Sequence, residues 1–490
     1  MQPDPSFLLA AIRREILAPD FFGAGLEVGL SPIHAQRAGV ALAQLEMRHA
    51  ALPGIAAGLR PRQLALLAKL TAGLREIGAT PPDVPPETLP DEAGEVAIAR
   101  YERLASEISA GISLWSREYA GRSRENFDMF CREAAGIEQD LRAACNQAMD
   151  ALREAHKARD LLVPAPLAAP RPEDLAAYIR AHVPGGAQAE VTDFRRLPGA
   201  NSKDIYLFTL AGLPGWPEES VLRRQPSFNV TETSVADEFE LLRLLHDSGV
   251  PVPRVLLTER EASHLGGAFL VMERVPGAVR LPETLGVDGL KIVADIARHM
   301  AGFHNIDVAT LPASHRPAGG LREQMLDVLE HYYQRWCKDR RDSSMALEAG
   351  FAWMRANVDC LGEDISLVHG DCNHRNILID GDHVSVFLDW ELAHAGHAAE
   401  DLGYIRPDIE KIVPWPEFMA MYRQAGGRHV TDEALRYFQV WSNVWRTAMA
   451  VSCYAGYPNG GHRNFILATV GCNEYYPTLD DLCSLLIAGA

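Results

Sequence analysis

Residues 367–391 read LVHGDCNHRNILIDGDHVSVFLDWE, and this stretch decides how the rest of the chain is interpreted. Two short apolar runs, residues 377–379 and 384–388, flank a polar turn that contains glycine, which is the pattern of a β-hairpin. A loop rich in Asp, Asn and His precedes the first run. The pattern therefore predicts a polar loop that leads directly into a hairpin.

The register of this hairpin predicts a metal site. We expect Asp380 to pair with His383 across the turn. Antiparallel pairing then places Asn376 opposite Phe387 and brings Asp389 to the same end of the hairpin. With ~3.3 Å per residue along a strand and ~5 Å between strands, the backbones of Asn376 and Asp389 are roughly 8 Å apart. Their oxygen atoms suit Mg²⁺, which takes few protein ligands and completes its shell with phosphate and water.

Asp371 lies in the same loop, five residues before Asn376. A carboxylate beside a metal-phosphate site is placed to act as the general base of phosphoryl transfer. The alternative is that these polar residues only cap and turn the backbone. A zinc site at Cys372 and His374 is disfavoured, because no further Cys or His completes a zinc-binding spacing. The combination of loop spacing, hairpin and a second acid favours the phosphoryl-transfer interpretation.

The composition of the whole chain narrows the class of protein. Its 490 residues predict two or three domains, and 47% hydrophobic residues are ordinary for a globular protein. A net charge of −18 disfavours a nucleic-acid partner. The eight cysteines are scattered without a disulfide or zinc pattern, which favours a reduced, cytoplasmic protein. We expect no signal peptide at the N-terminus and no membrane-spanning segment.

Residues 1–162 predict an all-α domain that carries no chemical motif. The apolar periodicity predicts helices over the following ranges: 7–17, 32–52, 61–77, 92–119 and 125–161. Residues 163–172 contain four prolines and predict a stiff linker. The role of the helical domain is left open between oligomerisation and contact with another protein.

Strand-like runs begin after the linker. They cover residues 189–195, 205–210, 220–224 and 268–273, with a helix at residues 236–247 before the last run. The remainder of the chain is largely helical around the polar loop. A small-residue turn that includes Ser202 and Lys203 could lie over phosphates through its backbone N–H groups and the serine hydroxyl. The alternative is an ordinary hairpin turn.

Cations and an acid near these strands predict further nucleotide contacts. Arg223 and Arg224 end the third strand, and Glu238 lies near the start of the following helix. Such a cation and acid can form an ion pair that positions the cation on phosphates. Two exposed arginines and an exposed glutamate are the alternative. The strand at residues 268–273 ends in a segment suited to a hinge, whose backbone could bind adenine.

These segments together resemble the aminoglycoside phosphotransferase and choline kinase family. Three motifs carry the resemblance: His369-Gly370-Asp371-x4-Asn376, Asp389-Trp390-Glu391 and Asp401-Leu402-Gly403. The branch that it looks like includes the kinase region fused to some acyl-CoA dehydrogenases. The resemblance covers roughly residues 172–480 and implies an α+β, protein-kinase-like fold of two lobes, which the all-α domain precedes. We expect a small, mainly β N-lobe at 173–275 and a larger, mainly α C-lobe at 276–490.

The resemblance also implies roles for individual residues. Asp371 would be the catalytic base, while Asn376 and Asp389 would hold Mg²⁺ on the phosphates of ATP, with GTP left open. Glu238 would pair with the cation of the third strand, and the backbone from Glu273 to Val275 would contact adenine. The remaining motif residues would support the loop, His369 from within it and Asp401 as a hydrogen-bonding brace.

Two departures from the family pattern concern the phosphate cradle. Arg223 occupies a strand position where relatives often have lysine, and arginine is a planar fork rather than a point charge. Lys203 lies where a small polar residue is common in relatives, and we expect it to supply charge to the phosphates. The cofactor-binding candidates are therefore Ser202, Lys203, Arg223, Glu238, Glu273 and Val275.

The sequence thus predicts an ATP- and Mg²⁺-dependent kinase that phosphorylates a hydroxyl of a small molecule. A hydroxy acid or its thioester is the preferred acceptor, and an aminoglycoside or a choline-like alcohol is the alternative. A nucleotide-binding regulatory pseudokinase is the rival function, favoured by Arg223 and by a phosphate loop with one glycine where relatives often have two. An enzyme that phosphorylates protein side chains lacks support, because no activation-loop-like segment lies between Asp389 and Asp401.

Overall fold

The computed structural model describes ten segments of the chain: residues 51–81, 95–119, 124–156, 170–197, 203–225, 233–261, 264–317, 319–340, 343–456 and 465–489. The chain forms two compact units. One contains Met1–Pro166, Met325–Asp359 and Val440–Ala490, and the other contains Leu167–Gln324 and Cys360–Gln439. The units thus interleave along the sequence, whereas the predicted domains follow chain order; those domain boundaries stay a prediction.

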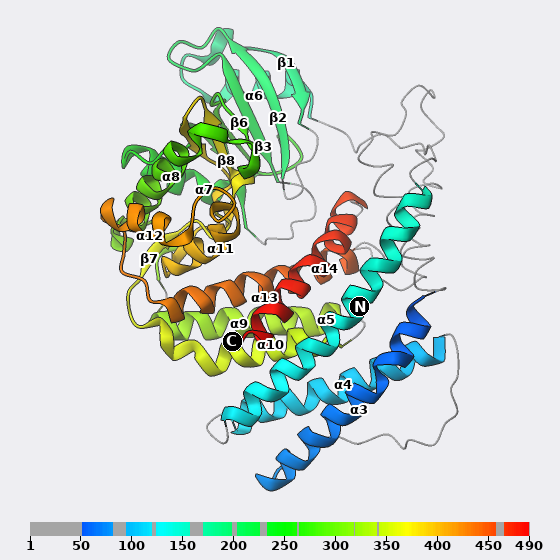
Figure 1. Cartoon of the computed structure of the whole chain (residues 1–490). Coiled ribbons are helices and arrows are strands. Elements are labelled where there is room, and N and C mark those ends of the chain that lie inside the picture. Colours follow the sequence, from blue (N-terminus) through cyan, green and yellow to red (C-terminus); the bar gives the residue numbers. More distant parts are fainter. Residues whose placement is uncertain are drawn as a thin grey trace. The chain divides into compact units, whose positions relative to one another are not determined.

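The first unit is helical. Its N-terminal helices are α3 (Leu52–Glu76), α4 (Glu95–Tyr119) and α5 (Arg124–His156). They group with α10 (Met345–Asn357), α14 (Phe465–Ile487) and most of α9 (Leu321–Asp339) and α13 (Asp432–Gly456). α10 packs against α4, α5 and α14 (Figure 1). The predicted helix at 7–17, and nearly all of the one at 32–52, lie outside the described residues.

A buried acid fixes the start of α10 in this unit. Glu138 of α5 accepts the Ala346 N–H at 2.9 Å and the Ser344 hydroxyl at 2.8 Å. The Ser344 hydroxyl in turn accepts the Leu347 N–H, as a helix N-cap residue does. The carboxylate also lies at the positive end of the helix dipole. The helices from the N-terminal part of the chain therefore share one fold with helices from the C-terminal half.

The second unit begins with a mainly β region. Its antiparallel sheet has the order β1-β2-β3-β5-β4. The strands are β1 (Glu190–Arg196), β2 (Asp204–Ala211), β3 (Glu219–Arg224), β4 (Val255–Glu259) and β5 (Phe269–Glu273). Helix α6 (Pro172–His182) precedes the sheet, and α7 (Val235–Asp247) lies between β3 and β4 in sequence. Four strands and α7 agree with the predicted ranges to within one residue.

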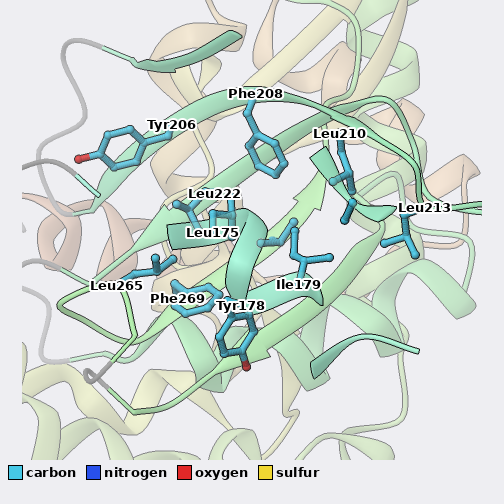
Figure 2. Close-up of a cluster of buried hydrophobic side chains, with 12 residues drawn as sticks. Leu175, Tyr178, Ile179, Tyr206, Phe208, Leu210, Leu213, Leu222, Leu265 and Phe269 are labelled. Atoms are coloured by element: carbon cyan, nitrogen blue, oxygen red, sulfur yellow. The ribbon is translucent and has the colours of Figure 1, made fainter. Parts of the chain in front are cut away.

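Apolar side chains of α6 form the core of this region with the sheet. Leu175 and Ile179 point from α6 toward Phe208 of β2 and Leu222 of β3 (Figure 2). All four are almost completely buried. Residues four apart on a helix lie on one face, and so do residues two apart on a strand, so α6 and β2 each present one apolar face. The burial makes the sheet a rigid support for residues on its other face.

The remainder of the second unit is mainly helical with short strands. Helices α8 (Gly289–His304), α11 (Ala399–Ile409) and α12 (Trp415–Gln424) belong to it. β6 (Ala278–Val279), β8 (Ile377–Asp380) and β9 (His383–Phe387) form one sheet, and β7 (Ser366–Val368) pairs with β10 (His394–Gly396). Within the described part of the chain, no helix has both the length and the hydropathy to cross a membrane.

The predicted hairpin is present, but its predicted register is wrong by one residue. Asp380 pairs with His383 as expected, yet Ile377 rather than Asn376 lies opposite Phe387. The register shifts between Leu378 and Ile379, because β9 contains one extra residue, Ser385. Its hydroxyl donates to the carbonyl of Pro276 at 2.6 Å, a contact distant in sequence that holds the bulge.

Candidate active site

Asp371 lies in a loop whose backbone is shaped by glycine. Gly370 has φ +80°, and a Cβ atom there would lie 2.4 Å from the carbonyl oxygen of Leu392. Only glycine fits this close approach without strain. The loop leaves β7 at Val368 and enters the short 3₁₀ helix His374–Asn376 before β8. The local sequence thus sets both the turn and the entry to the hairpin.

Two amides hold the carboxylate of Asp371. Asn376 donates from Nδ2 to Asp371 Oδ2 at 2.8 Å, and Asn373 donates from Nδ2 to Oδ1 at 2.9 Å. Both amides also donate to the main-chain oxygen of Asp371. N–H donors of this kind favour a charged carboxylate. Because they contact both of its oxygens, they also fix its orientation, so Asp371 can act as a proton acceptor. The Asn376 Nδ2 atom faces Asp371, so its Oδ1 atom is the atom suited to a metal.

Helix α11 braces both ends of this loop through two acids. Asp401 accepts the N–H groups of His369 at 2.7 Å and Gly370 at 2.9 Å. Asp408 accepts the N–H of His374 at 3.0 Å and its ring Nδ1 at 2.7 Å. Seven residues separate the two acids, which places them on one face of the helix. The loop therefore takes its position from a rigid element.

Buried groups around Asp401 keep it ionised. His304 of α8 donates from Nε2 to Asp401 at 3.1 Å, and its Nδ1 lies 2.8 Å from the Tyr422 hydroxyl. Burial opposes ionisation of Asp401, but the hydrogen bond and charge of His304 outweigh it and lower the pKa of Asp401. His304 is thus a packed histidine with a partner on each ring nitrogen.

The imidazole of His369 supports the loop from within. Its Nε2 donates to the carbonyl of Leu388 at 2.9 Å, and its Nδ1 accepts the N–H of Asp371 at 3.3 Å. Burial lowers the pKa of His369, so the ring is neutral. The ring also lies against Trp390, with centroids 4.5 Å apart. His369 therefore links the loop to the strand end that precedes Asp389.

Asp389 has an unusual backbone conformation directly after β9. Its φ of 66° and ψ of 57° are left-handed, which few residues other than glycine adopt. The N–H of Leu388 donates to the carbonyl of Asn376 at 2.8 Å, so Asp389 follows a residue hydrogen-bonded to the other predicted metal ligand. Such strain is common where a side chain must face a ligand.

Arg223 joins Asp389 to helix α7. Its guanidinium donates to Glu238 Oε2 at 2.6 Å and to Asp389 Oδ1 at 2.7 Å. Burial raises the pKa of Glu238 to about 7 although Arg223 opposes that shift. Burial would lower the pKa of Arg223, but Glu238 and Asp389 raise it, so the cation is retained. The structure thus contains the predicted pairing of a strand cation with a helix acid.

Lys203 lies on the same face of the sheet as Arg223. Ile205 is paired with Arg223, and Lys203 is two residues before Ile205. The Lys203 ammonium forms an ion pair with Glu391 at 2.8 Å and contacts the carbonyl of Thr233 at 3.3 Å. Arg224 points to the opposite face, where it pairs with Asp204. Arg223, and not Arg224, is therefore the strand cation of the site.

The predicted adenine contacts lie at the end of β5. The Glu273 carboxylate accepts the N–H of Arg254 at 2.8 Å, and its own N–H donates to the Arg254 carbonyl at 3.0 Å. Any role in adenine binding would therefore use the main chain of Glu273 and Val275, as predicted. Among the described residues, no side-chain hydrogen bond joins the segment 273–275 to the ion pairs that Arg223 forms. Ser202 lies outside the described residues.

The charged groups fit a divalent cation bound with phosphate. Three acids, Glu238, Asp389 and Glu391, accompany the cations Lys203 and Arg223, so one negative charge is in excess when all three are ionised. Burial and repulsion from Glu391 raise the pKa of Asp389, a cost that a metal ion would relieve. Among the described residues, no three His, Cys, Asp or Glu form a metal cluster. A site of one carboxylate and one amide oxygen suits Mg²⁺ with phosphate.

An unpartnered donor supports the same fit. Arg223 Nε is buried and has no hydrogen-bond partner among the described residues, and Glu238 Oε1 is likewise unpartnered. Buried polar groups are normally satisfied, so such a donor beside the Asp389 carboxylate suits a phosphate oxygen.

The family follows from a comparison of the sequence with known proteins. A model described as the phosphotransferase enzyme family matches residues 193–438, half of the chain. This chain belongs to the phosphotransferase enzyme family. Membership of this family agrees with the predicted enzyme class, a phosphotransferase. The matched residues include the loop of Asp371, the hairpin and the sheet that carries Arg223.

Individual relatives of this phosphotransferase are distant. Acyl-CoA dehydrogenase family member 11 of Mus musculus is 24% identical over 341 residues, which cover 64% of this chain and 42% of that protein. This chain thus spans less than half the length of that relative. Aminoglycoside 3'-phosphotransferase of Niallia circulans is 25% identical over 209 residues, which cover 41% of this chain and 75% of that enzyme. Both agree with the predicted family and branch.

A solved structure confirms the fold. A crystal structure from Ralstonia eutropha JMP134, assigned as an aminoglycoside phosphotransferase, superposes with a TM-score of 0.51 and 20% identity. The alignment covers 65% of this phosphotransferase and 98% of that chain. The predicted α+β, kinase-like fold with a preceding helical region is therefore correct.

Sequence reasoning missed three residues of the site. Asn373 was given no role, although an Asn two residues after an Asp is a local signal for a side-chain hydrogen bond. Asp408 was missed too, although it lies seven residues after Asp401, a spacing that puts both on one face of a helix. The pairing of Glu391 with Lys203 had no local signal, because the residues are far apart in sequence.

Proposed function

We propose that this phosphotransferase uses ATP and Mg²⁺ to phosphorylate a hydroxyl of a small molecule, with Asp371 as general base and Asn376 and Asp389 as metal ligands. The observation that carries the proposal is the hydrogen bond from Asn376 to Asp371. It places the proposed base beside a proposed ligand, and the N–H of Leu388 connects that ligand to the strand end before Asp389.

The proton of the acceptor hydroxyl would move to Asp371. The amides of Asn373 and Asn376 keep its carboxylate oriented. Asp401 holds the backbone on which Asp371 is mounted, so the base requires no rearrangement before it acts. When bound, Mg²⁺ would supply the charge that neutralises the phosphates.

Arg223 would bind a phosphate oxygen beside the metal-binding carboxylate. Its guanidinium is anchored by Glu238 and Asp389, and its Nε atom remains as a donor. A guanidinium offers several donors in a fixed plane, so it can hold two acids and a phosphate together. We propose ATP as the donor nucleotide, with GTP as the alternative, and main-chain contacts of Glu273 and Val275 to the base.

We propose a hydroxy acid or its thioester as the acceptor. The similarity to acyl-CoA dehydrogenase family member 11 supports this class. The similarity to aminoglycoside 3'-phosphotransferase supports the alternative, an amino sugar or a choline-like alcohol. Fold alone does not choose between these acceptors.

Transfer of label from γ-labelled ATP to a metabolite pool tests the proposal. We expect the wild type to label an acid- or thioester-containing fraction in the presence of Mg²⁺, and Asp371→Asn to label none. Competition by hydroxy acids, their CoA thioesters, aminoglycosides and choline then identifies the acceptor class. A wild type that binds Mg·ATP but matches Asp371→Asn in every fraction would support a regulatory pseudokinase instead.

A further inference from the structure

The ion pair of Lys203 and Glu391 is a buried cation–acid contact beside the proposed metal site. The Lys203 Nζ atom lies 2.8 Å from Glu391 Oε2, and the side chains are 1% and 6% exposed. The carbonyl of Thr233 lies 3.3 Å from the same ammonium. Desolvation of two charges is costly, so a pair of this kind needs good geometry or a functional reason.

Glu391 is connected to Asp389 by a rigid turn. The two residues flank Trp390, which is completely buried and donates from Nε1 to the carbonyl of Phe387 at 3.1 Å. The turn Trp390–Leu392 is a 3₁₀ helix that begins directly after Asp389. A displacement of the Glu391 side chain would therefore be transmitted to the carboxylate of Asp389.

Charge balance explains why Glu391 needs its own cation. Arg223 already serves Glu238 and Asp389 at distances of 2.6 and 2.7 Å. If Lys203 lost its charge, Glu391 would be a buried carboxylate without its partner cation. It would then compete with Asp389 for Arg223 or for the metal.

We propose that Lys203 and Glu391 form a positioning pair, which reserves Arg223 and the metal ion for Asp389 rather than binding the nucleotide phosphates themselves. This inference rests on the proposed function. It replaces the expectation that Lys203 supplies charge to the phosphates directly. It also gives Glu391 of the Asp389-Trp390-Glu391 motif a role in setting metal affinity.

Equilibrium binding of a fluorescent ADP analogue to the full chain, in Mg²⁺ and in EDTA, tests the proposal. In Mg²⁺, Lys203→Met should bind the analogue roughly 10- to 100-fold more weakly than the wild type, the usual effect of losing a residue that supports a metal ligand. In EDTA the two proteins should have equal affinities, because Lys203 does not contact the nucleotide. A direct phosphate contact would weaken binding in both conditions and would overturn the proposal.

Variants of Glu391 give a second test, in which the two possible roles of Lys203 predict opposite changes in nucleotide affinity. Glu391→Gln should also weaken Mg²⁺-dependent binding, because it leaves a buried ammonium beside Asp389. If Lys203 bound phosphate, the same change would free it and strengthen binding in EDTA. The double variant Lys203→Met/Glu391→Gln carries no unpaired charge and should recover most of the Mg²⁺-dependent affinity. A double variant as weak as Lys203→Met would contradict the proposal.

Control variants and the wild type distinguish three outcomes: a folding defect, failure of the proposed function, and failure of this inference alone. Lys203→Arg retains the cation and should bind the analogue in Mg²⁺ more tightly than Lys203→Met does. Lys291→Met removes an exposed ammonium that pairs with Asp382, and should change neither affinity nor thermal unfolding. If Lys203→Met does not fold, Glu391→Gln and the double variant still decide the question. A wild type that binds no nucleotide in either condition would refute the proposed function, whereas equal affinities of wild type and Lys203→Met in Mg²⁺ would refute only this inference.

Discussion

The loop around Asp371 and the cluster around Arg223 belong to one site but are held by different forces. Backbone N–H groups and neutral amides hold the loop, with Asp401 and Asp408 of α11 as acceptors. Ion pairs between β3, α7 and the end of β9 hold the cluster. Hydrogen bonds to backbone fix geometry, whereas ion pairs can exchange partners when a charged ligand arrives. The difference suggests that the loop determines rate and the cluster determines nucleotide affinity.

The largest effect should come from the proposed base, Asp371. Asp371→Asn keeps the shape of the side chain but removes the proton acceptor, so phosphoryl transfer should fall by roughly three orders of magnitude. Nucleotide affinity should change little, since the charged cluster is intact. Steady-state kinetics with the identified acceptor, together with analogue binding, measure both quantities. A parallel loss of affinity would show that the two regions are not separate.

Loss of the brace should act on stability. Asp401→Ala leaves the buried N–H groups of His369 and Gly370 without their acceptor and should lower the free energy of unfolding by roughly 3 kcal/mol. Urea denaturation measures this change. The matched control, Asp382→Ala, removes an acid that is about half exposed and should have less than roughly 1 kcal/mol of effect. Equal effects of the two variants would mean that α11 does not hold the loop.

A change in the cluster should act on affinity alone. Arg223→Lys keeps the charge but cannot bridge Glu238, Asp389 and a phosphate, so affinity for Mg·ATP should fall roughly tenfold, the cost of about one charge-assisted hydrogen bond. Arg224→Lys is the matched control, because this neighbour faces the opposite side of the sheet. Calorimetric titration of both variants distinguishes the two strand positions.

The smallest effect concerns acid stability near the loop. His397 accepts the N–H of Ala399 at the start of α11, and burial lowers the pKa of His397 to about 4. A neutral histidine in the folded state stabilises the protein above its unfolded pKa of about 6.5, and this stability is lost as the pH falls toward 4. His397→Asn should reduce that acid sensitivity by on the order of 1 kcal/mol. Thermal unfolding across this pH range would show it as a flatter profile, and an unchanged profile would exclude His397 as the cause.

Much of the fold could be predicted because its signals are local. The strand that carries Arg223 and the helix that carries Glu238 follow from periodicity, and Ser234 caps that helix by accepting the N–H of Ala236. The hairpin register could not be predicted, because the bulge at Ser385 depends on its hydrogen bond to Pro276. Contacts between residues distant in sequence leave no local pattern.

The same distinction applies to the site. The spacing of Asp371 and Asn376, combined with the hairpin and the acid at its end, predicted that they act together. Strand and helix order offered the contact of Arg223 with Glu238 as one of two interpretations, and the structure contains this contact. The partner of Lys203 was not predictable, because Glu391 lies far from Lys203 in the sequence and only the folded chain brings them together. The positive charge of Lys203 suggested a phosphate contact, whereas the burial of its side chain beside Glu391 favours the supporting role that we propose.

Nucleotide binding by Asp389→Asn and Asp371→Asn, compared in Mg²⁺ and in EDTA, tests the division of roles most directly. The account predicts that Asp389→Asn loses the Mg²⁺-dependent part of nucleotide affinity, while Asp371→Asn keeps it and loses only phosphoryl transfer. Retention of Mg²⁺-dependent binding by Asp389→Asn, or its loss in Asp371→Asn, would contradict the assignment of metal binding to Asp389 and of proton acceptance to Asp371.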